Sequence, residues 1–227
     1  MLGIKKKGSN LEPGKILDEI ERAAYTAMKP YGFKKYGRTL HRFVSGDISQ
    51  VVNFQLGQAY RGETHLLYVN VGIRVPECKT RRFTAEEAAK KYYHEYECNM
   101  RSRLGEIEGK KESCYDLRKP TGPIIKDILR QIQGLVIPAF EVLNSREAIL
   151  ARRRDYPQFD TMNDHLILLE EAMIYGRRGE LEKAGETFNR YYRLCESEQM
   201  KHQYPRTIQI HLDYLDRLAA ELGIEVK

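Results

Sequence analysis

The sequence contains no tryptophan and only four cysteines among its 227 residues. The cysteines are widely separated, and none lies in a CxxC pair or near a histidine at zinc-finger spacing. Free thiols of this kind are typical of a reducing compartment. No run approaches about eighteen consecutive apolar residues, and no apolar segment follows the basic start. These absences predict a reduced, cytoplasmic protein with no membrane span and no signal peptide.

The motifs of common enzyme classes are missing as well. The six histidines are scattered, without HExxH or HxH spacing, and no aspartate cluster has calcium-loop spacing. Neither a GxSxG nucleophile turn nor a GxxxxGK[ST] or GxGxxG phosphate-binding loop occurs. We therefore expect no metal, no cofactor and no assigned catalytic residue.

The composition is that of a globular protein, with 31% charged and 41% hydrophobic residues. The net charge of +6 would permit contact with nucleic acid, acidic lipid or an acidic protein, although a solvated basic surface accounts for it equally. The length suits one large domain or two small ones, and two are expected here.

The N-terminal part predicts helices and an antiparallel sheet. Residues 1–12 are expected to be a flexible basic arm, and an amphipathic helix runs from Pro13 to Met28. Three strands follow over residues 36–44, 47–57 and 64–75. Since short links join them, they should pair antiparallel.

Further helices and strands are predicted up to residue 150. The capping box TAEE at residues 84–87 predicts a helix over 85–93. Strands over 95–108 and 111–118 flank a Gly-Lys turn, and a long helix over 122–143 should bend at Pro138. Residues 13–150 are thus predicted to be an α+β domain, an antiparallel β-sheet of about five strands covered by helices.

Residues 156–227 show no strand signal and predict an all-α domain. Three helices are expected over about 162–177, 180–197 and 205–222. The first two match a tetratricopeptide-like helical hairpin, in which small, aromatic and turn-glycine positions are filled by Ala172, Tyr175, Gly179, Leu181, Ala184 and Phe188. The last helix would cap this hairpin through Ile208, Leu212, Leu215 and Leu222. A generic antiparallel helical bundle fits the same pattern.

Six stretches of the first domain, taken in order, resemble a known family. They are YGFKKYGRTLHR, ISQVVNFQLG, LLYVNVGI, ECNMRSRLG, CYDL and VIPAFEVLNSREAIL. Over about residues 13–150 the chain is similar to a bacterial domain-of-unknown-function family, number forty-three hundred and four. The resemblance implies a compact α+β domain of bacterial, cytosolic origin, and it implies no reaction, cofactor or catalytic residue.

The strand over residues 47–57 alternates between an apolar and a polar side. Ile48, Val52 and Phe54 should face a core, whereas Asn53 and Gln55 lie on the other side, which we expect to be turned outward. Neighbouring strands would add further polar groups, giving a candidate binding face of Thr39, His41, Asn53, Gln55, Asn70 and Arg74. Amides and arginine suit a peptide backbone, a carboxylate or a base edge, but a solvated outer face would look the same.

Two weaker patterns concern nucleic acids. Glu97, Glu108 and Lys110 imitate the acidic and Glu-x-Lys layout of metal-dependent nucleases, although the last two fall at a predicted turn where charged residues are simply solvated. Basic clusters occur at Lys5–Lys7, Lys34–Lys35, Arg81–Arg82 and Arg152–Arg154. Nucleic-acid binders usually combine such charge with exposed aromatic residues or present it along one helix. Here the clusters lie apart in the sequence and acidic residues dilute them, which favours solvated surface features.

These patterns predict a cytosolic protein that binds rather than catalyses, and the family resemblance implies a bacterial origin. The expected partner is a protein, held by the polar sheet face or the concave side of the helical domain. A homo-oligomer is also compatible with a single repeat-like hairpin that needs a neighbour. An immunity or regulatory role is suggested only by analogy with other small domains. The alternatives are nucleic-acid binding through a basic surface and a metal-dependent nuclease-like enzyme.

Overall fold

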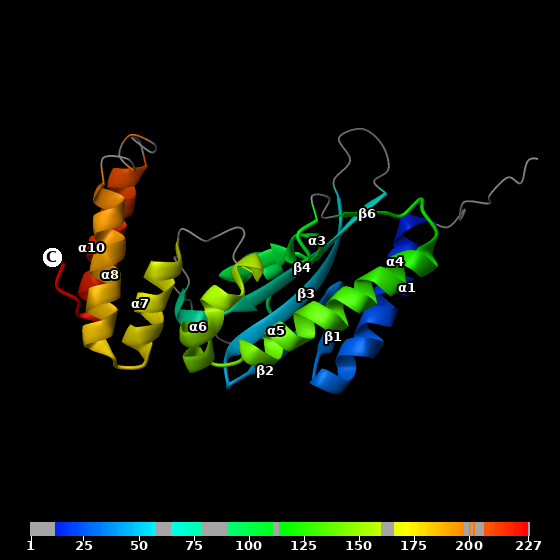
Figure 1. Cartoon of the computed structure of the whole chain (residues 1–227), viewed down its shortest axis with the longest axis horizontal. Helices are drawn as coiled ribbons and strands as arrows, with labels where there is room; N and C mark the ends of the chain where they lie inside the picture. The colour runs from blue at the N-terminus through cyan, green and yellow to red at the C-terminus, as the bar shows by residue number, and fades with distance from the viewer. Residues whose placement is uncertain are drawn as a thin grey trace, which may run out of the picture. The chain divides into compact units, whose positions relative to one another are not determined.

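A computed structural model describes residues 12–57, 65–78, 90–110, 114–159, 166–197, 200, 202 and 207–226 (Figure 1). The contacts divide the chain into two units. The first unit comprises residues 1–75 and 82–162, and the second comprises 76–81 and 163–227. The expected basic arm lies outside the described residues except for Glu12, which directly precedes the first helix.

The first unit contains a six-stranded antiparallel sheet. Its strands are β1 Lys34–Tyr36, β2 Thr39–Val44, β3 Ile48–Leu56, β4 Leu66–Arg74, β5 Met100–Arg103 and β6 Cys114–Asp116. The order is β1-β2-β3-β4-β5, and β6 also pairs with β4. The meander of β2, β3 and β4 confirms the antiparallel arrangement that the short links predicted. At the β2–β3 turn, Ser45 and Gly46 both have positive φ, 47° and 87°.

The last two strands do not form the predicted hairpin. β5 pairs with the second half of β4, residues 70–73, and β6 pairs with its first half, residues 66–68. Between them lie the short helix α3 Leu104–Ile107 and the turn at Gly109, whose φ is 75°. The predicted strand over 95–108 was therefore too long, since it contains a 3₁₀ turn, η3 Glu95–Glu97, then β5 and α3.

Helices cover the apolar face of the sheet. They are α1 Pro13–Met28, followed by the 3₁₀ turn η1 Lys29–Tyr31, and a continuous run of α4 Thr121–Gln131, the π-helical turn η4 Ile132–Val136 and α5 Ile137–Val142 (Figure 1). α1 and α4 pack side by side. Their buried side chains recur at helical spacing, and include Ile16, Leu17, Ile20, Ile124 and Ile128.

The irregularity expected at Pro138 takes the form of the π turn. Proline has no N–H to donate, and its ring would collide with the carbonyl group four residues earlier in a regular α-helix. In the wider turn the N–H of Ile137 bonds to the carbonyl of Ile132, five residues back. The helix therefore continues past the proline, and α6 Arg146–Arg152 and the 3₁₀ turns Arg153–Asp155 and Pro157–Phe159 complete the unit.

Gln50 of β3 connects this helix to the sheet. Its side chain is fully buried, and its amide donates to the carbonyl oxygens of Phe140 and Leu143 at 2.6 and 3.2 Å. Its own oxygen accepts from Arg42 Nε at 2.7 Å. The amide thus satisfies carbonyl groups at the end of α5 that the helix itself cannot bond.

The second unit consists of the 3₁₀ turn η2 Pro76–Cys78 and the helices α7 Ile167–Arg177, α8 Leu181–Glu196 and α10 Ile208–Leu222. α7 and α8 form the expected hairpin, with Ala172, Ala184 and Phe188 fully buried and Gly179 in the turn at φ 77°. α10 closes the core through Ile208, Leu212 and Leu215. Its Leu222 packs against Gly176, where an added Cβ would approach the leucine to 3.3 Å.

Candidate functional site

The strand register places all six residues of the candidate face on the same side of the sheet. Directly paired residues point to one face of an antiparallel pair. Thr39, Asn53 and Asn70 are opposite one another on β2, β3 and β4, and Ser49 lies opposite Arg74. His41 and Gln55 follow by the two-residue alternation of each strand. We call this side the polar face.

Residues 90–99, the covering segment, lie over half of the polar face. The Arg74 guanidinium is stacked 3.8 Å from the ring centre of Tyr93, and His41 lies in ring contact with Tyr93 and Phe43. Cys98 sits directly on Gly72, where an added Cβ would come within 2.6 Å of the cysteine sulfur. Only glycine permits this close approach.

The expectation that the whole polar face is turned outward was therefore wrong. Thr39, His41, Asn70 and Arg74 are buried, with Arg74 only 1% exposed, and only Gln55 is exposed while Asn53 is half-buried. The helix predicted over 85–93 falls outside the described residues up to 89, and residues 90–93 are not helical.

In the covered half, burial favours the neutral forms of His41 and Cys98. Burial, together with the nearby Arg74, lowers the pKa of His41 to about 4. Burial also raises the pKa of the Cys98 thiol far above its usual range. Two polar atoms there, His41 Nε2 and Ser49 Oγ, have no hydrogen-bond partner among the described residues. Their burial makes this half part of the packed interior rather than an accessible surface.

The remaining part of the polar face, the open half, is formed around Asn53, Gln55, Tyr68 and Arg103. Asn70 donates to Gln55 Oε1 at 3.0 Å, and Asn53 donates to Thr39 Oγ1 at 3.0 Å. The Arg103 guanidinium stacks on Tyr68, 4.4 Å from its ring centre. Amide and guanidinium groups thus flank an aromatic ring at partly exposed positions.

An aromatic row borders this surface, and the sequence reasoning missed it. It consists of Tyr36, Tyr92, His94 and Tyr96. Tyr92, His94 and Tyr96 recur at every second residue, and this spacing could have revealed them, although Tyr96 lies in the 3₁₀ turn η3. The capping box at residues 84–87 favoured a helix instead, and that prediction concealed the pattern.

The nuclease-like residues are not assembled into one site. Glu97 accepts from Lys90 Nζ at 2.7 Å and from the His94 N–H at 2.9 Å, within the covering segment. Glu108 instead pairs with Lys110 at 2.6 Å and with Arg130 of α4, which packs with α1 over the other side of the sheet.

Ion pairs lower the pKa of the Glu108 carboxyl group. Hydrogen bonds from Lys110 and Arg130 hold the pKa of Glu108 below its usual value, and Asp127 joins the same network. Within the described ranges, no group of three or more histidine, cysteine, aspartate or glutamate side chains is placed to hold a metal ion.

The basic clusters differ from one another. Lys34 is exposed, Lys35 pairs with buried Glu21 at 2.8 Å, and Arg152 pairs with Asp155 at 2.6 Å. Arg153 is fully buried. The clusters at 5–7 and 81–82 lie outside the described residues. Among the described members of these clusters, Lys34 pairs with His41 across β1 and β2 and therefore lies on the polar face.

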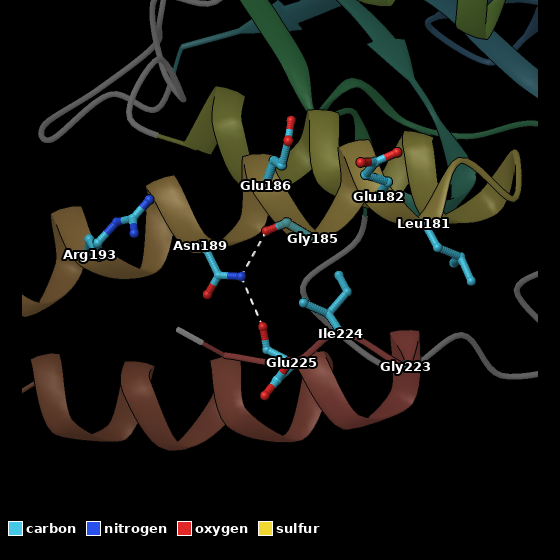
Figure 2. Close-up of a pocket in the computed structure, with 9 residues that line it drawn as sticks. All are labelled: Leu181, Glu182, Gly185, Glu186, Asn189, Arg193, Gly223, Ile224 and Glu225. Atoms are coloured by element: carbon cyan, nitrogen blue, oxygen red, sulfur yellow. Dashed lines mark hydrogen bonds between the residues drawn. The ribbon is translucent and has the colours of Figure 1, made fainter.

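A groove of about 420 Å³ lies in the helical unit (Figure 2). One wall is α8, and the other is the segment 223–225 that follows α10. Asn189 joins the two walls, because its amide donates to the carbonyls of Gly185 and Glu225 at 2.9 Å each. Leu181 and Ile224 line one end, and Arg193 lies toward the other.

The fold of the first unit is an α+β domain, in which helices cover one face of an antiparallel sheet. Residues 24–142, just over half of the chain, match the family described as a domain of unknown function, DUF4304. The chain belongs to this family, which confirms the resemblance found in the sequence. No curated protein and no solved structure matches the chain. Among the helices that the structure describes, none is long and apolar enough to cross a membrane.

Proposed function

We propose that this protein is a non-catalytic interaction module that binds a segment of a partner protein in the groove of its helical unit. The single observation that carries the proposal is the groove beside α8, where Asn189 links the helix to the segment 223–225. The polar sheet face was the other surface considered for a protein partner. It supports this role less well because four of its six residues are buried.

The dimensions of the groove suit an extended peptide. Leu181, Gly185, Asn189 and Arg193 follow one another at four-residue spacing along α8. Twelve residues of helix extend over about 18 Å, the length of about five or six residues of extended chain. Ile224 lies against Gly185, where an added Cβ would meet Ile224 Cγ2 at 3.9 Å, so this part of the groove presents an apolar side chain to a peptide.

The chemistry of the groove favours a basic peptide with an apolar residue. Leu181 is 55% exposed and lines the groove together with Ile224. Glu182 and Glu186 are exposed carboxylates on the same wall, opposed by the single cation Arg193. A lysine or arginine side chain would find two carboxylates there, and an apolar side chain would cover Leu181.

Selection from a displayed library of random peptides against the full chain tests this function. We expect enrichment of peptides that combine lysine or arginine with an apolar residue. Synthetic versions should bind the full chain and lose at least about fivefold in affinity to Glu186→Lys. The matched control is Glu19→Lys, which makes the same charge change at an exposed position of α1. Absence of any enriched peptide, or equal binding to Glu186→Lys, would contradict the proposal.

A further inference from the structure

The aromatic row is a surface on which rings already stack. Tyr36 and Tyr92 lie parallel with their ring centres 4.6 Å apart, and His94 and Tyr96 lie nearly parallel at 5.2 Å. Tyr92 and His94 join the two pairs edge to face at 5.2 Å. Tyr96 is 63% exposed, so the outer end of the row is open to a further planar group.

The Tyr36 end of the row lies on the same side of the sheet as the open half of the polar face. Tyr36 pairs with Thr39 at the edge of the sheet, and the same cross-strand line continues through Asn53 and Asn70 to Arg103. Stacking surfaces therefore lie beside side-chain amides that can both donate and accept hydrogen bonds. These are the two kinds of group that recognise an unpaired base, one through its ring face and the other through its edge.

Positive charge accompanies the rings. Lys34 is two residues before Tyr36 on β1, so both side chains point to the same face, and Lys34 is exposed. Lys91 is exposed next to Tyr92. Neighbouring cations are balanced, since Lys35 and Arg38 face Glu21, Lys90 pairs with Glu97 and Arg101 pairs with Glu95. Among the described residues, no ion pair joins Lys34 or Lys91 to an acidic side chain, and both are exposed.

We propose that the aromatic row and the open half of the polar face bind single-stranded nucleic acid. The bases would stack on Tyr96 and the neighbouring rings, and Lys34 and Lys91 would contact phosphates. A duplex would not suit this surface, since its paired bases present no free ring face to the tyrosines. This surface belongs to the first unit and is separate from the groove of the proposed function, so each can fail without the other.

Fluorescence anisotropy with a labelled oligothymidine of about 20 nucleotides tests the proposal. Two phosphate contacts predict that the logarithm of the affinity falls with the logarithm of salt at a slope of about −1.4. The affinity should therefore fall about sevenfold between about 50 and 200 mM salt. Tyr96→Ala should weaken binding at least about fivefold, and Tyr96→Phe should retain the wild-type affinity because a phenyl ring also stacks.

Matched variants separate this surface from the rest of the chain. Tyr31→Ala removes another exposed tyrosine, and Lys126→Glu reverses an exposed charge on α4, so both should bind like the wild type. Lys34→Glu combined with Lys91→Glu should abolish the salt dependence. Glu186→Lys in the helical groove should leave oligothymidine binding unchanged.

Several results would overturn the proposal. One is the absence of oligothymidine and oligouridine binding at about 50 mM salt, where electrostatic attraction is strong. Another is wild-type affinity in Tyr96→Ala. Equal competition by inorganic polyphosphate would show that only charge is recognised, and equal competition by duplex DNA would show that unpaired bases are not required.

Discussion

Replacing Gly72 with alanine tests whether the covering segment is seated on the polar face. The added Cβ would lie 2.6 Å from Cys98 Sγ and 2.7 Å from Cys98 Cβ, and 3.4 Å from the carbonyl oxygen of Met100. Carbon and sulfur atoms in contact are normally separated by about 3.5–4.0 Å. Since one of the close atoms is Cys98 Cβ, rotation of the cysteine side chain cannot relieve the clash. The covering segment must therefore move away from β4.

The size of the effect follows from the cost of overpacking. Extra carbon in a well-packed interior typically costs about 1–3 kcal/mol. If the segment alone responds, the equilibrium for lifting it from the sheet shifts by about 5-fold to 150-fold. The Cys98 thiol reports on this motion, because it is buried and its pKa is raised in the closed state.

Alkylation by iodoacetamide, followed residue by residue with mass spectrometry, measures the opening. In the wild type Cys98 should react much more slowly than the partly exposed Cys114. In Gly72→Ala the alkylation rate of Cys98 should rise by about 5-fold to 150-fold, while the alkylation rate of Cys114 stays the same. Gly122→Ala is the matched control, since its Cβ would meet nothing within 4 Å. An unchanged rate at Cys98 together with unchanged stability would refute the placement of residues 90–99 on the sheet.

Two further predictions concern buried polar side chains. The pKa of His41 is about 4 in the folded protein and about 6.5 in the unfolded chain. As pH falls, the unfolded chain therefore takes up a proton at His41 before the folded protein does. The free energy of unfolding thus decreases between pH 6.5 and pH 4. The loss should reach about 3 kcal/mol relative to His41→Gln, measured by urea unfolding at a series of pH values, and parallel curves for the two proteins would contradict it. Gln50→Met removes the amide's two bonds to Phe140 and Leu143 and its bond from Arg42, and should cost about 2–4 kcal/mol in the free energy of unfolding. A cost below about 0.5 kcal/mol in the same urea experiment would show that these bonds do not hold α5 to the sheet.

Local periodicity was sufficient to predict much of the fold. Apolar and polar residues alternate along β2, β3 and β4, and short links join these strands. Both features are local, and short links leave antiparallel pairing as the favoured arrangement. The apolar positions of α1, α4 and α8 likewise repeat at helical spacing within one segment. The glycine that ends α7, Gly179, predicted the hairpin turn correctly because the positive φ there favours glycine.

Pairing of distant segments was not predictable in the same way. β5 and β6 follow each other closely in the chain, which favoured a hairpin, but both bond to β4 instead. The choice depends on which edge of the sheet is free once β3 and β4 have paired. No pattern within residues 95–118 contains that information.

The sequence by itself determined that one side of β3 is apolar and the other polar, because side chains alternate along any extended strand. Only the tertiary structure decided that half of the polar side is covered. That outcome depends on the close packing of Cys98 on Gly72 and on the stacking of Tyr93 on Arg74, which are contacts between residues 26 and 19 apart in the chain. Composition and hydrophobic periodicity are properties of a single segment. The burial of a side chain depends on which other segments pack against it.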